Sequence, residues 1–473
     1  MEQREYRKHV GLFSAIMLIA GSMIGSGVFI VGADITRVGG TGTFLLLAWG
    51  LTAVMTIFGA LSYGELAGIF PKAGGQYTYL REIYGPLPGF LYGWTFFAII
   101  ECGTIAAVGT AFGKYLGAFL PGVSDGSWLL GPWHIPAWRP IADIAVGPYD
   151  LGITTARLSG IAIIVLLSAV NVYGIKLGSR VQNLFTVTKI ACLVGLILLG
   201  LALAPTHAPS QAPFVPQPAN QALPFLVALL VVQTGSLFSA DAWNSVTFIA
   251  GEVKEPRRTI PIALFVGTGL VCGLYILANA VFLKVLGATG IAGATSDRVG
   301  SAALEALFGP TGELVMAGAI LVSVFGCQNG LVLSGARVYQ TMAKDGLFLD
   351  RAARLSTRGV PAFSLAIQAV WASLLTLSGT YGQLLDYVIF AALLFYFLTV
   401  LGVIVLRVRR PELERPVKVL AYPVLPAAYL VGALAIMAAL LVYRPAFTWP
   451  GLAIVAIGVP IYFLRRRGIR RPG

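Results

Sequence analysis

The stretch LIAGSMIGSGVFIVG, residues 18–32, lies inside the first long apolar segment of the chain. Four glycines and two serines occupy this part of a segment that is long enough to cross a membrane. In a helix interior, glycine costs about 1 kcal/mol relative to alanine. The consecutive residues Gly25, Ser26 and Gly27 are therefore predicted to interrupt the helix near the middle of the bilayer.

The composition is typical of an integral membrane protein. Of the 473 residues, 57% are apolar and only 11% are charged, and the mean hydropathy is +0.83. A soluble domain carries about 25% charged residues, so a soluble enzyme is excluded. The sequence predicts an all-α integral membrane protein with twelve transmembrane helices, because apolar runs of about 18 residues can cross the hydrocarbon core. The predicted spans are residues 12–36, 43–70, 88–120, 157–175, 181–204, 221–250, 260–286, 313–340, 361–379, 383–408, 419–443 and 447–465.

The net charge of +13 reflects the orientation of the chain in the membrane. With twelve spans, most of the 33 Lys and Arg residues fall in segments on the side that carries both termini. Cytoplasmic segments of membrane proteins are enriched in these residues. We therefore expect a multi-pass protein of the cell inner membrane with cytoplasmic N- and C-termini, and no nucleic-acid partner.

The sixth span is also interrupted by polar residues. The stretch GSLFSADAWNSV, residues 235–246, places Ser239, Asp241 and Asn244 in an otherwise apolar run. A charged carboxyl at this depth costs several kcal/mol unless it is paired or faces water. Interruptions at corresponding positions of two repeats are typical of inverted-repeat secondary transporters.

If the chain consists of two five-span repeats followed by two further spans, the interrupted helices 1 and 6 occupy corresponding positions, and an odd number of spans per repeat makes the second repeat inverted. Residues 1–204 form the first repeat, residues 205–220 a Pro-rich extracellular loop, and residues 221–408 the second repeat. Two additional helices and a basic cytoplasmic end occupy residues 409–473.

Broken helices expose backbone groups that hydrocarbon cannot satisfy. Amides at the start of the outer half-helix favour an anion, and freed carbonyls at the end of the inner half-helix favour a cation. A small zwitterion fits such a pair. The alternative is that Gly21 and Gly25 form a GxxxG contact, which lets two helices pack closely.

Several motifs together resemble the amino acid–polyamine–organocation (APC) superfamily of transporters, and in particular bacterial homologues of the L-type amino acid transporters. The resemblance covers nearly the whole chain. Its motifs are GSMIGSGVFIVG (residues 21–32), SYGELAGIFPKAGGQYTYLREIYG (62–85), LFSADAWNSVTFIAGEVKEPRRTIPIAL (237–264) and SVFGCQNGLVLSGARVYQTMAKDG (323–346). The implied fold is the LeuT-like five-plus-five repeat, also called the APC fold, with two further helices.

The resemblance also implies a substrate site at the two breaks. The α-carboxylate of an L-amino acid would bind the amides of Gly25, Ser26 and Gly27. The α-amino group would bind carbonyls near Ile24 and those of Phe238, Ser239 and Asp241, with Phe238 as an aromatic gate and Asn244 as a polar residue that tunes the site. The small residues Gly25, Ser239 and Ala240 leave room for a small or medium neutral side chain.

Lys189 lies within the fifth span and has two interpretations. Its ammonium group could extend to the membrane surface. Alternatively, as the family resemblance implies, it is a fixed cation that bridges the break in span one to span eight and replaces a sodium ion. Many relatives carry a serine where this chain has Cys327, and Ser323, one turn earlier, could substitute for that serine.

Two carboxyl groups in the spans remain open to interpretation. Asp241 could accept a proton, bind the substrate amine or be capped by the amides of the helix break. Glu101, in the third span, could be a protonated carboxyl that is hydrogen-bonded to neighbouring helices or a coupling site. No metal-binding or nucleophile pattern is present in the sequence, so no metal, cofactor or catalytic residue is expected.

These observations favour a sodium-independent exchanger of L-amino acids that works by alternating access. The alternatives are a proton-coupled amino acid symporter and, in a different class, an amino acid sensor that does not transport. Eukaryotic L-type transporters join a glycoprotein subunit through a cysteine in the loop after span three. Residues 121–156 contain no cysteine, so no disulfide-linked ancillary subunit is expected.

Overall fold

The computed structural model describes residues 6–469 except residues 137, 142–143, 147–148, 204–222 and 379–380. Within these residues, nine helices are long and apolar enough to cross a membrane, so the chain is a multi-pass membrane protein. They are α3 (Gly42–Ile69), α5 to α6 (Pro86–Leu116), α7 (Thr155–Val172), α8 (Ile175–Leu203), α12 (Pro256–Ala292), α14 (Pro310–Lys344), α16 (Tyr381–Arg409), α17 (Val424–Tyr443) and α18 (Pro445–Ile469).

The helix predicted at residues 12–36 is divided in the structure. Helix α1 (Leu12–Met23) ends just before Gly25, a 3₁₀ turn η1 follows at Gly27–Phe29, and α2 (Val31–Gly39) continues the segment. The sixth predicted span is likewise divided, into α9 (Phe225–Val231), α10 (Gln233–Ser239) and α11 (Ser245–Phe248).

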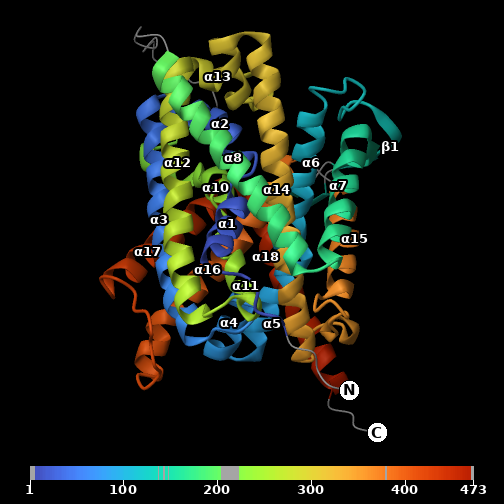
Figure 1. The fold of residues 1–473 in the computed structure, drawn as a ribbon, viewed down its shortest axis with the longest axis vertical. Helices are drawn as coiled ribbons and strands as arrows, with labels where there is room; N and C mark the ends of the chain where they lie inside the picture. The colour runs from blue at the N-terminus through green and yellow to red at the C-terminus, as the bar shows by residue number, and fades with distance from the viewer. Residues whose placement is uncertain are drawn as a thin grey trace.

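The divided segments lie in the middle of the bundle (Figure 1). Helix α1 packs against α8, α12 and α14, while α10 packs against α3 and α16. Helix α12 packs along α3 over much of its length. The remaining described helices are α4 (Gln76–Tyr84), α13 (Val299–Phe308) and α15 (Ala362–Ser378), with short turns at η3 (Ala250–Glu252), η4 (Thr295–Asp297) and η5 (Asp350–Ala353).

The all-α prediction is incomplete, because residues 121–156 are not only loop. Strand β1 (Trp128–Ile135) pairs with β4 (Tyr149–Thr154) in an antiparallel ribbon, and β2 (Trp138–Ile141) pairs with β3 (Ile144–Val146). The ribbon projects from the ends of α6 and α7 (Figure 1). Irregular register and the positive φ of Gly131 and Gly152 break the alternation that would have indicated strands in the sequence.

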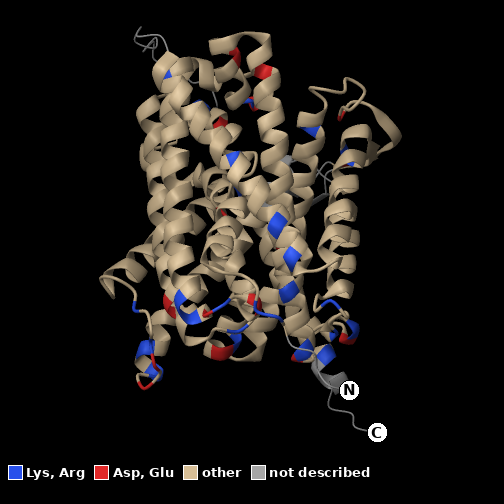
Figure 2. Ribbon diagram, viewed as in Figure 1, with Lys and Arg blue, Asp and Glu red and all other residues tan. Residues whose placement is uncertain are grey.

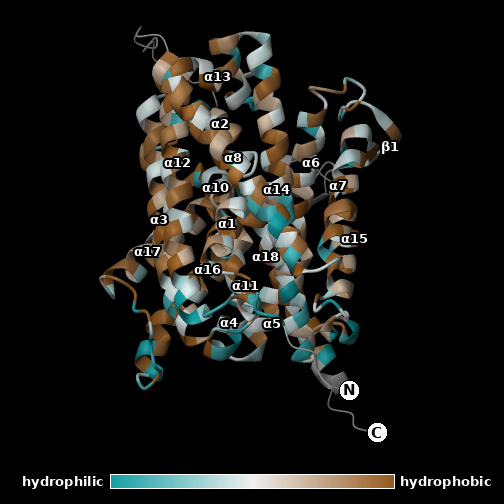
Figure 3. Cartoon of the chain, viewed as in Figure 1, coloured by the Kyte–Doolittle hydropathy of each residue, from teal (hydrophilic) through white to brown (hydrophobic). Residues whose placement is uncertain are grey.

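Basic residues gather at the end of the bundle where the first and last described residues lie (Figure 2); we call this the basic end. Here Arg337 of α14 donates to Glu252 at 3.1 Å, and both side chains are only 1% exposed. The backbone oxygen of Glu252 accepts from the amides of His9 and Val10 at 2.9 and 3.0 Å. The N-terminal segment is thus tied to the chain that follows α11. Apolar residues cover much of the outer helices between the two ends of the bundle (Figure 3).

Candidate functional site

The end of α1 is held by a buried lysine. The Nζ atom of Lys189, on α8, donates to the carbonyl oxygens of Gly21 at 2.6 Å, Ile24 at 2.7 Å and Ser323 at 3.1 Å. The residue is 2% exposed, so its ammonium does not extend to the membrane surface. Its three donors are used by carbonyls of α1 and α14, which satisfies the usual capacity of an ammonium group.

Two residues of α14 complete the attachment of α1. The hydroxyl of Ser323 lies 3.0 Å from the carbonyl oxygen of Ile24 and 3.3 Å from that of Gly25. The thiol of Cys327 donates to the carbonyl oxygen of Ser22 at 2.9 Å. Both α14 side chains therefore contact the backbone where α1 ends, and Lys189 contacts the same turn.

The backbone amides that follow α1 lack hydrogen-bond partners among the described residues, whereas the carbonyls at its end have them. Within the described residues, the amides of Gly25, Ser26 and Gly27 donate to no carbonyl. The Ser26 hydroxyl is also buried without a hydrogen-bond partner. Unpaired amides at the start of a helical segment are typical of anion-binding sites.

The glycines of this stretch differ in the space around them. A Cβ atom on Gly27 would lie 2.2 Å from the Oγ of Ser239 and 3.1 Å from its Cα, whereas one on Gly25 would lie 3.3 Å from the sulfur of Cys327. At Gly21 the nearest atom would be the Gln182 amide nitrogen, 1.9 Å away. Close helix packing therefore explains why position 21 is a glycine. The glycine at position 27 allows the first break to lie directly against α10.

The second break turns sharply after α10. Ala242 has φ of +66°, a conformation that costs about 1 kcal/mol or more in a residue other than glycine. The preceding residues Ser239 and Ala240 are 4% and 1% exposed. Strained backbone of this kind is concentrated at binding sites and switch regions.

A tyrosine that the sequence analysis did not single out joins the two breaks. The Tyr275 hydroxyl of α12 lies 2.8 Å from the carbonyl oxygen of Met23 and 3.0 Å from that of Ser239. Because a phenol has one proton, it can donate to either carbonyl. A tyrosine in an apolar helix has the pattern of an ordinary core residue, so its sequence context carried no signal.

Replacing Tyr275 by phenylalanine is expected to destabilise the protein by about 1 kcal/mol, because a buried carbonyl loses its donor while the ring remains. The thermal unfolding midpoint of the purified protein measures this effect. Tyr443→Phe, at a 41% exposed position, is the matched control. Equal midpoints for the Tyr275 variant and the unaltered protein would contradict the assigned contact.

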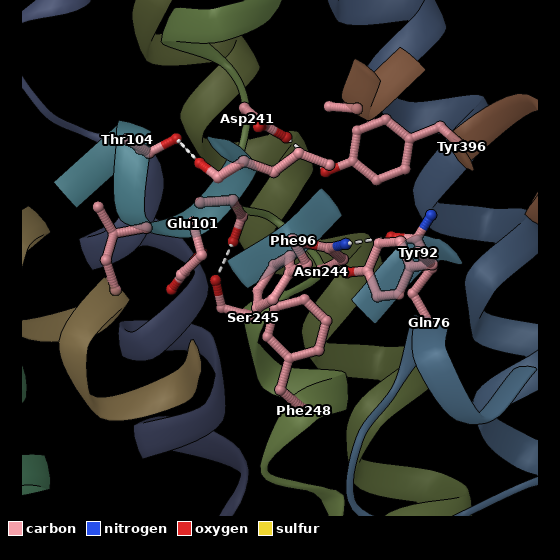
Figure 4. Close-up of a pocket in the computed structure, with 14 residues that line it drawn as sticks. Gln76, Tyr92, Phe96, Glu101, Thr104, Asp241, Asn244, Ser245, Phe248 and Tyr396 are labelled. Carbon is pink, nitrogen blue, oxygen red and sulfur yellow. Dashed lines mark hydrogen bonds between the residues drawn. The ribbon is translucent and has the colours of Figure 1, made fainter. Parts of the chain in front are cut away.

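Two cavities lie beside the second break and share Asp241 and Tyr396. The first lies between the second break, α6 and α16 (Figure 4). Its lining residues are Gln76, Tyr92, Phe96, Ile100, Glu101, Thr104, Asp241, Ala242, Asn244, Ser245, Phe248, Leu331, Ala392 and Tyr396. The second is lined by Met55, Thr56, Leu237, Asp241, Trp243, Ile389, Leu393, Tyr396 and Tyr429.

The polar residues of the second break are held by α16 and α4. The Tyr396 hydroxyl donates to Asp241 Oδ1 at 2.5 Å. The side-chain amide of Asn244 donates to Gln76 Oε1 at 3.1 Å, and Gln76 in turn donates to the Thr399 hydroxyl. Figure 4 shows the Tyr396–Asp241 and Asn244–Gln76 contacts at the wall of the first cavity.

The predicted substrate residues are therefore divided between two places. Asp241 and Asn244 line the first cavity, together with Glu101. The other predicted substrate residues line neither of the two cavities and lie at the ends of α1 and α10. These are Ile24, Gly25, Ser26, Gly27, Phe238, Ser239 and Ala240.

Glu101 begins α6, directly after a π-helical segment, η2 (Phe96–Ile100). Segments of this kind occur frequently at functional sites. The residue is 5% exposed, and its Oε1 atom has no hydrogen-bond partner. Within the described residues, the hydrogen bond to neighbouring helices, one of the two interpretations of Glu101, is therefore not formed at this oxygen.

The described residues contain no group of three His, Cys, Asp or Glu side chains placed to hold a metal ion. Cys102, Cys192, Cys272 and Cys327 are the four cysteines of the chain, and each is free. All four lie in helices.

Comparison with known proteins supports transport of amino acids. Residues 10–463 match the model of a family described as amino acid permease. The human b(0,+)-type amino acid transporter 1 is 30% identical over 97% of the chain and 88% of its own length. The serine/threonine exchanger SteT of Bacillus subtilis is 28% identical over 98% of both chains. The human large neutral amino acids transporter small subunit 2 is 29% identical over 97% of the chain and 80% of its own length.

Proposed function

The chain belongs to the amino acid permease family of the APC superfamily, and we propose that it is a sodium-independent exchanger of L-amino acids that works by alternating access. Transport of amino acids is the shared property of its relatives, and two of them are named an exchanger and a neutral amino acid transporter. We propose small and medium neutral amino acids as substrates, because Gly25, Ser239 and Ala240 leave little side-chain bulk at the breaks.

The observation that carries this proposal is the unpaired backbone at the first break. The amides of Gly25, Ser26 and Gly27 lack carbonyl partners within the described residues. In our proposal they bind the substrate carboxylate, which the positive end of the following helical segment also stabilises. In the same proposal the α-amino group binds backbone carbonyls near Ile24 and at residues 238–241, where the freed carbonyl end of a half-helix favours a cation.

Lys189 supports independence from sodium. Its ammonium already occupies a position between the carbonyls of Gly21, Ile24 and Ser323. A monovalent cation at this place would face a fixed positive charge of the protein. We propose that the Lys189 ammonium replaces a bound ion in the attachment of α1 to α14, where Ser323 and Cys327 are its neighbours.

We further propose twelve spans in two inverted repeats, residues 1–204 and 221–408, followed by two helices in residues 409–473. The interrupted segments at residues 24–30 and 240–244 support this division. The extracellular loop at residues 205–220 lies outside the described residues. The concentration of Lys and Arg supports a cytoplasmic location of the basic end, and hence of both termini, in the cell inner membrane.

Alternating access would move the segments that carry the breaks against the rest of the bundle. These segments are the first, second, sixth and seventh spans, which correspond to α1 and α2, α3, α9 to α11, and α12. The close packing of α12 on α3 and α1 supports their motion as a unit.

We propose that the transporter has no disulfide-linked partner. One relative is named a small subunit. In this chain, residues 121–156 contain no cysteine, and the free cysteines lie in helices.

Proton-coupled symport is the second candidate, and Glu101 favours it. A buried carboxyl group without a hydrogen bond at one oxygen can bind and release a proton as its surroundings change. A sensor that binds amino acids without transporting them is a candidate of a different class, but no relative named above is described as a sensor.

Counterflow in proteoliposomes tests the proposal. Vesicles preloaded with one unlabelled amino acid are expected to take up its labelled form in choline buffer as fast as in sodium buffer. A panel of the twenty amino acids as competitors then defines the substrates. Uptake into empty vesicles driven by external acid would support symport instead. Binding without uptake under any condition would indicate a sensor.

A further inference from the structure

The ribbon formed by β1 and β4 has two different faces. Three of its cross-strand pairs are apolar on both strands: Leu130 with Ile153, Trp133 with Leu151, and Ile135 with Tyr149. The β4 members of these pairs are two residues apart along the strand, so the three pairs share one face, which we call the apolar face. His134 pairs with Asp150 on the opposite face, where the two side chains are in contact.

The part of the opposite face nearest α7 packs on the bundle. The Cζ atom of Arg157, on α7, lies 5.2 Å from the centroid of the Trp128 ring, and a Cβ atom on Gly152 would meet the same ring at 2.7 Å. Arg157 also donates to the carbonyl oxygens of Gly152 at 3.1 Å and of Leu377, at the end of α15, at 2.9 Å. The arginine is only 6% exposed. The ribbon is thus fixed to two helices through one side, and its apolar face points away from them.

Much of the apolar face is exposed. On β1, Leu130 is 56% exposed, Trp133 60% and Ile135 43%, and their partners on β4 are half-buried. Neither strand contains Lys or Arg. Exposed apolar side chains that are gathered on one face favour binding to an apolar surface.

The position of the ribbon indicates which apolar surface this is. Strand β4 ends at Thr154 and α7 begins at Thr155, so no linker separates the ribbon from a helix that can cross the membrane. On α7, Leu158, Val165 and Leu166 are between 48% and 54% exposed, as expected of side chains that face lipid. In Figure 1 the ribbon lies beside α7 at the edge of the bundle, toward the end opposite the basic end. The apolar face therefore continues the lipid-facing surface of α7 at the level where this span enters the membrane.

We propose that the apolar face binds the lipid bilayer, in the leaflet opposite to the basic end. Trp133 and Tyr149 supply aromatic rings of the kind that is enriched at membrane–water interfaces, and binding removes the exposed aliphatic side chains from water. The contact between His134 and Asp150 stays in water on the other face. Because Arg157 ties the ribbon to α7 and α15, binding to lipid fixes the adjoining ends of these two helices. The inference goes beyond the proposed function and does not depend on which substrate is transported.

Fluorescent labels on the two faces provide the test. Trp133→Cys and His134→Cys are made in a Cys192→Ser background, because Cys192 is the exposed cysteine of the chain and the other three are buried. His134 is the matched control, since it is the next residue along β1, lies on the opposite face and has a side chain that is 75% exposed. Each variant is labelled with nitrobenzoxadiazole in detergent and reconstituted into phosphatidylcholine vesicles, with iodide on both sides of the membrane. Iodide is expected to quench the label at position 133 about threefold less than the label at 134, because an anion is excluded from apolar surroundings. Lipid with a nitroxide near the headgroup is expected to quench the label at 133 more.

Two results would overturn the inference. Equal quenching of both labels by iodide would show that the apolar face is open to water. Weak quenching of the label at 133 by both iodide and nitroxide lipid would show that protein, in these vesicles a second copy of the chain, covers the face.

A second measurement avoids the label and keeps an aromatic ring at the position. Trp133→Phe removes one of the eight tryptophans, so the difference in fluorescence between the unaltered protein and this variant reports on Trp133. Phosphatidylcholine brominated on its acyl chains is expected to quench this difference. A difference that brominated lipid leaves unchanged would refute binding of the ribbon to lipid.

Discussion

Exchange by a Lys189→Met variant is expected to be about 10- to 100-fold slower than that of the unaltered protein, with a smaller change in the apparent affinity for substrate. The substitution keeps most of the side-chain volume but removes three hydrogen bonds from an ammonium to carbonyl oxygens. A hydrogen bond to a charged group contributes about 1.5–3 kcal/mol, and leaving buried carbonyls without donors adds to the cost. Because Lys189 contacts Gly21, Ile24 and Ser323 and lines neither cavity, the loss falls on the attachment of α1 to α14.

Initial counterflow rates over a range of substrate concentrations separate turnover from affinity. Lys284→Met is the matched control, since Lys284 also donates to a helix carbonyl, that of Leu201 at 2.8 Å, but is exposed. Sodium is added in a second series. Normal turnover by Lys189→Met would refute the role of the ammonium. Recovery of activity by sodium would strengthen it, because the ion would then replace the missing charge.

Gly27→Ala is expected to abolish measurable exchange, whereas Gly25→Ala is expected to retain part of it. A Cβ on Gly27 would lie 2.2 Å from Ser239 Oγ and 2.8 Å from Ser239 Cβ, closer than atoms can approach without movement of the backbone. At Gly25 the nearest atom is the Cys327 sulfur at 3.3 Å, which requires a shift of only a few tenths of an ångström. The order of the two effects follows from packing and does not depend on the identity of the substrate.

The double variant Gly27→Ala/Ser239→Gly provides an internal check. It removes the Oγ and Cβ atoms that the new methyl group would meet, although the Ser239 Cα remains at 3.1 Å. Partial recovery of binding, measured as thermal stabilisation by substrate, is expected relative to Gly27→Ala alone. Comparable yields of folded protein from all variants are required for the comparison. Full activity of Gly27→Ala would show that exchange does not require the close approach of the two breaks.

The membrane class and the family could be predicted from the sequence, because both depend on properties that each segment carries by itself. Long apolar runs predicted a multi-pass membrane protein, and the motifs around residues 21–32 and 237–264 predicted the family, which the family comparison confirms. The strands in residues 121–156 were missed, since register shifts between Trp128 and Trp133 and glycines with positive φ interrupt the regular alternation on which strand prediction depends.

The sequence by itself determined where the chain carries weak helix formers, mid-span polar residues and one lysine within a span. These features are local, because backbone propensity and the cost of burying charge apply residue by residue. The tertiary structure alone decided which of them meet. Tyr275 of α12 contacts carbonyls of both breaks. Glu101 of α6 lines the same cavity as Asp241. The side chains of Glu101 and Gln368 lie next to each other at Gly335. Such contacts depend on the packing of helices far apart in the chain, which no single segment encodes.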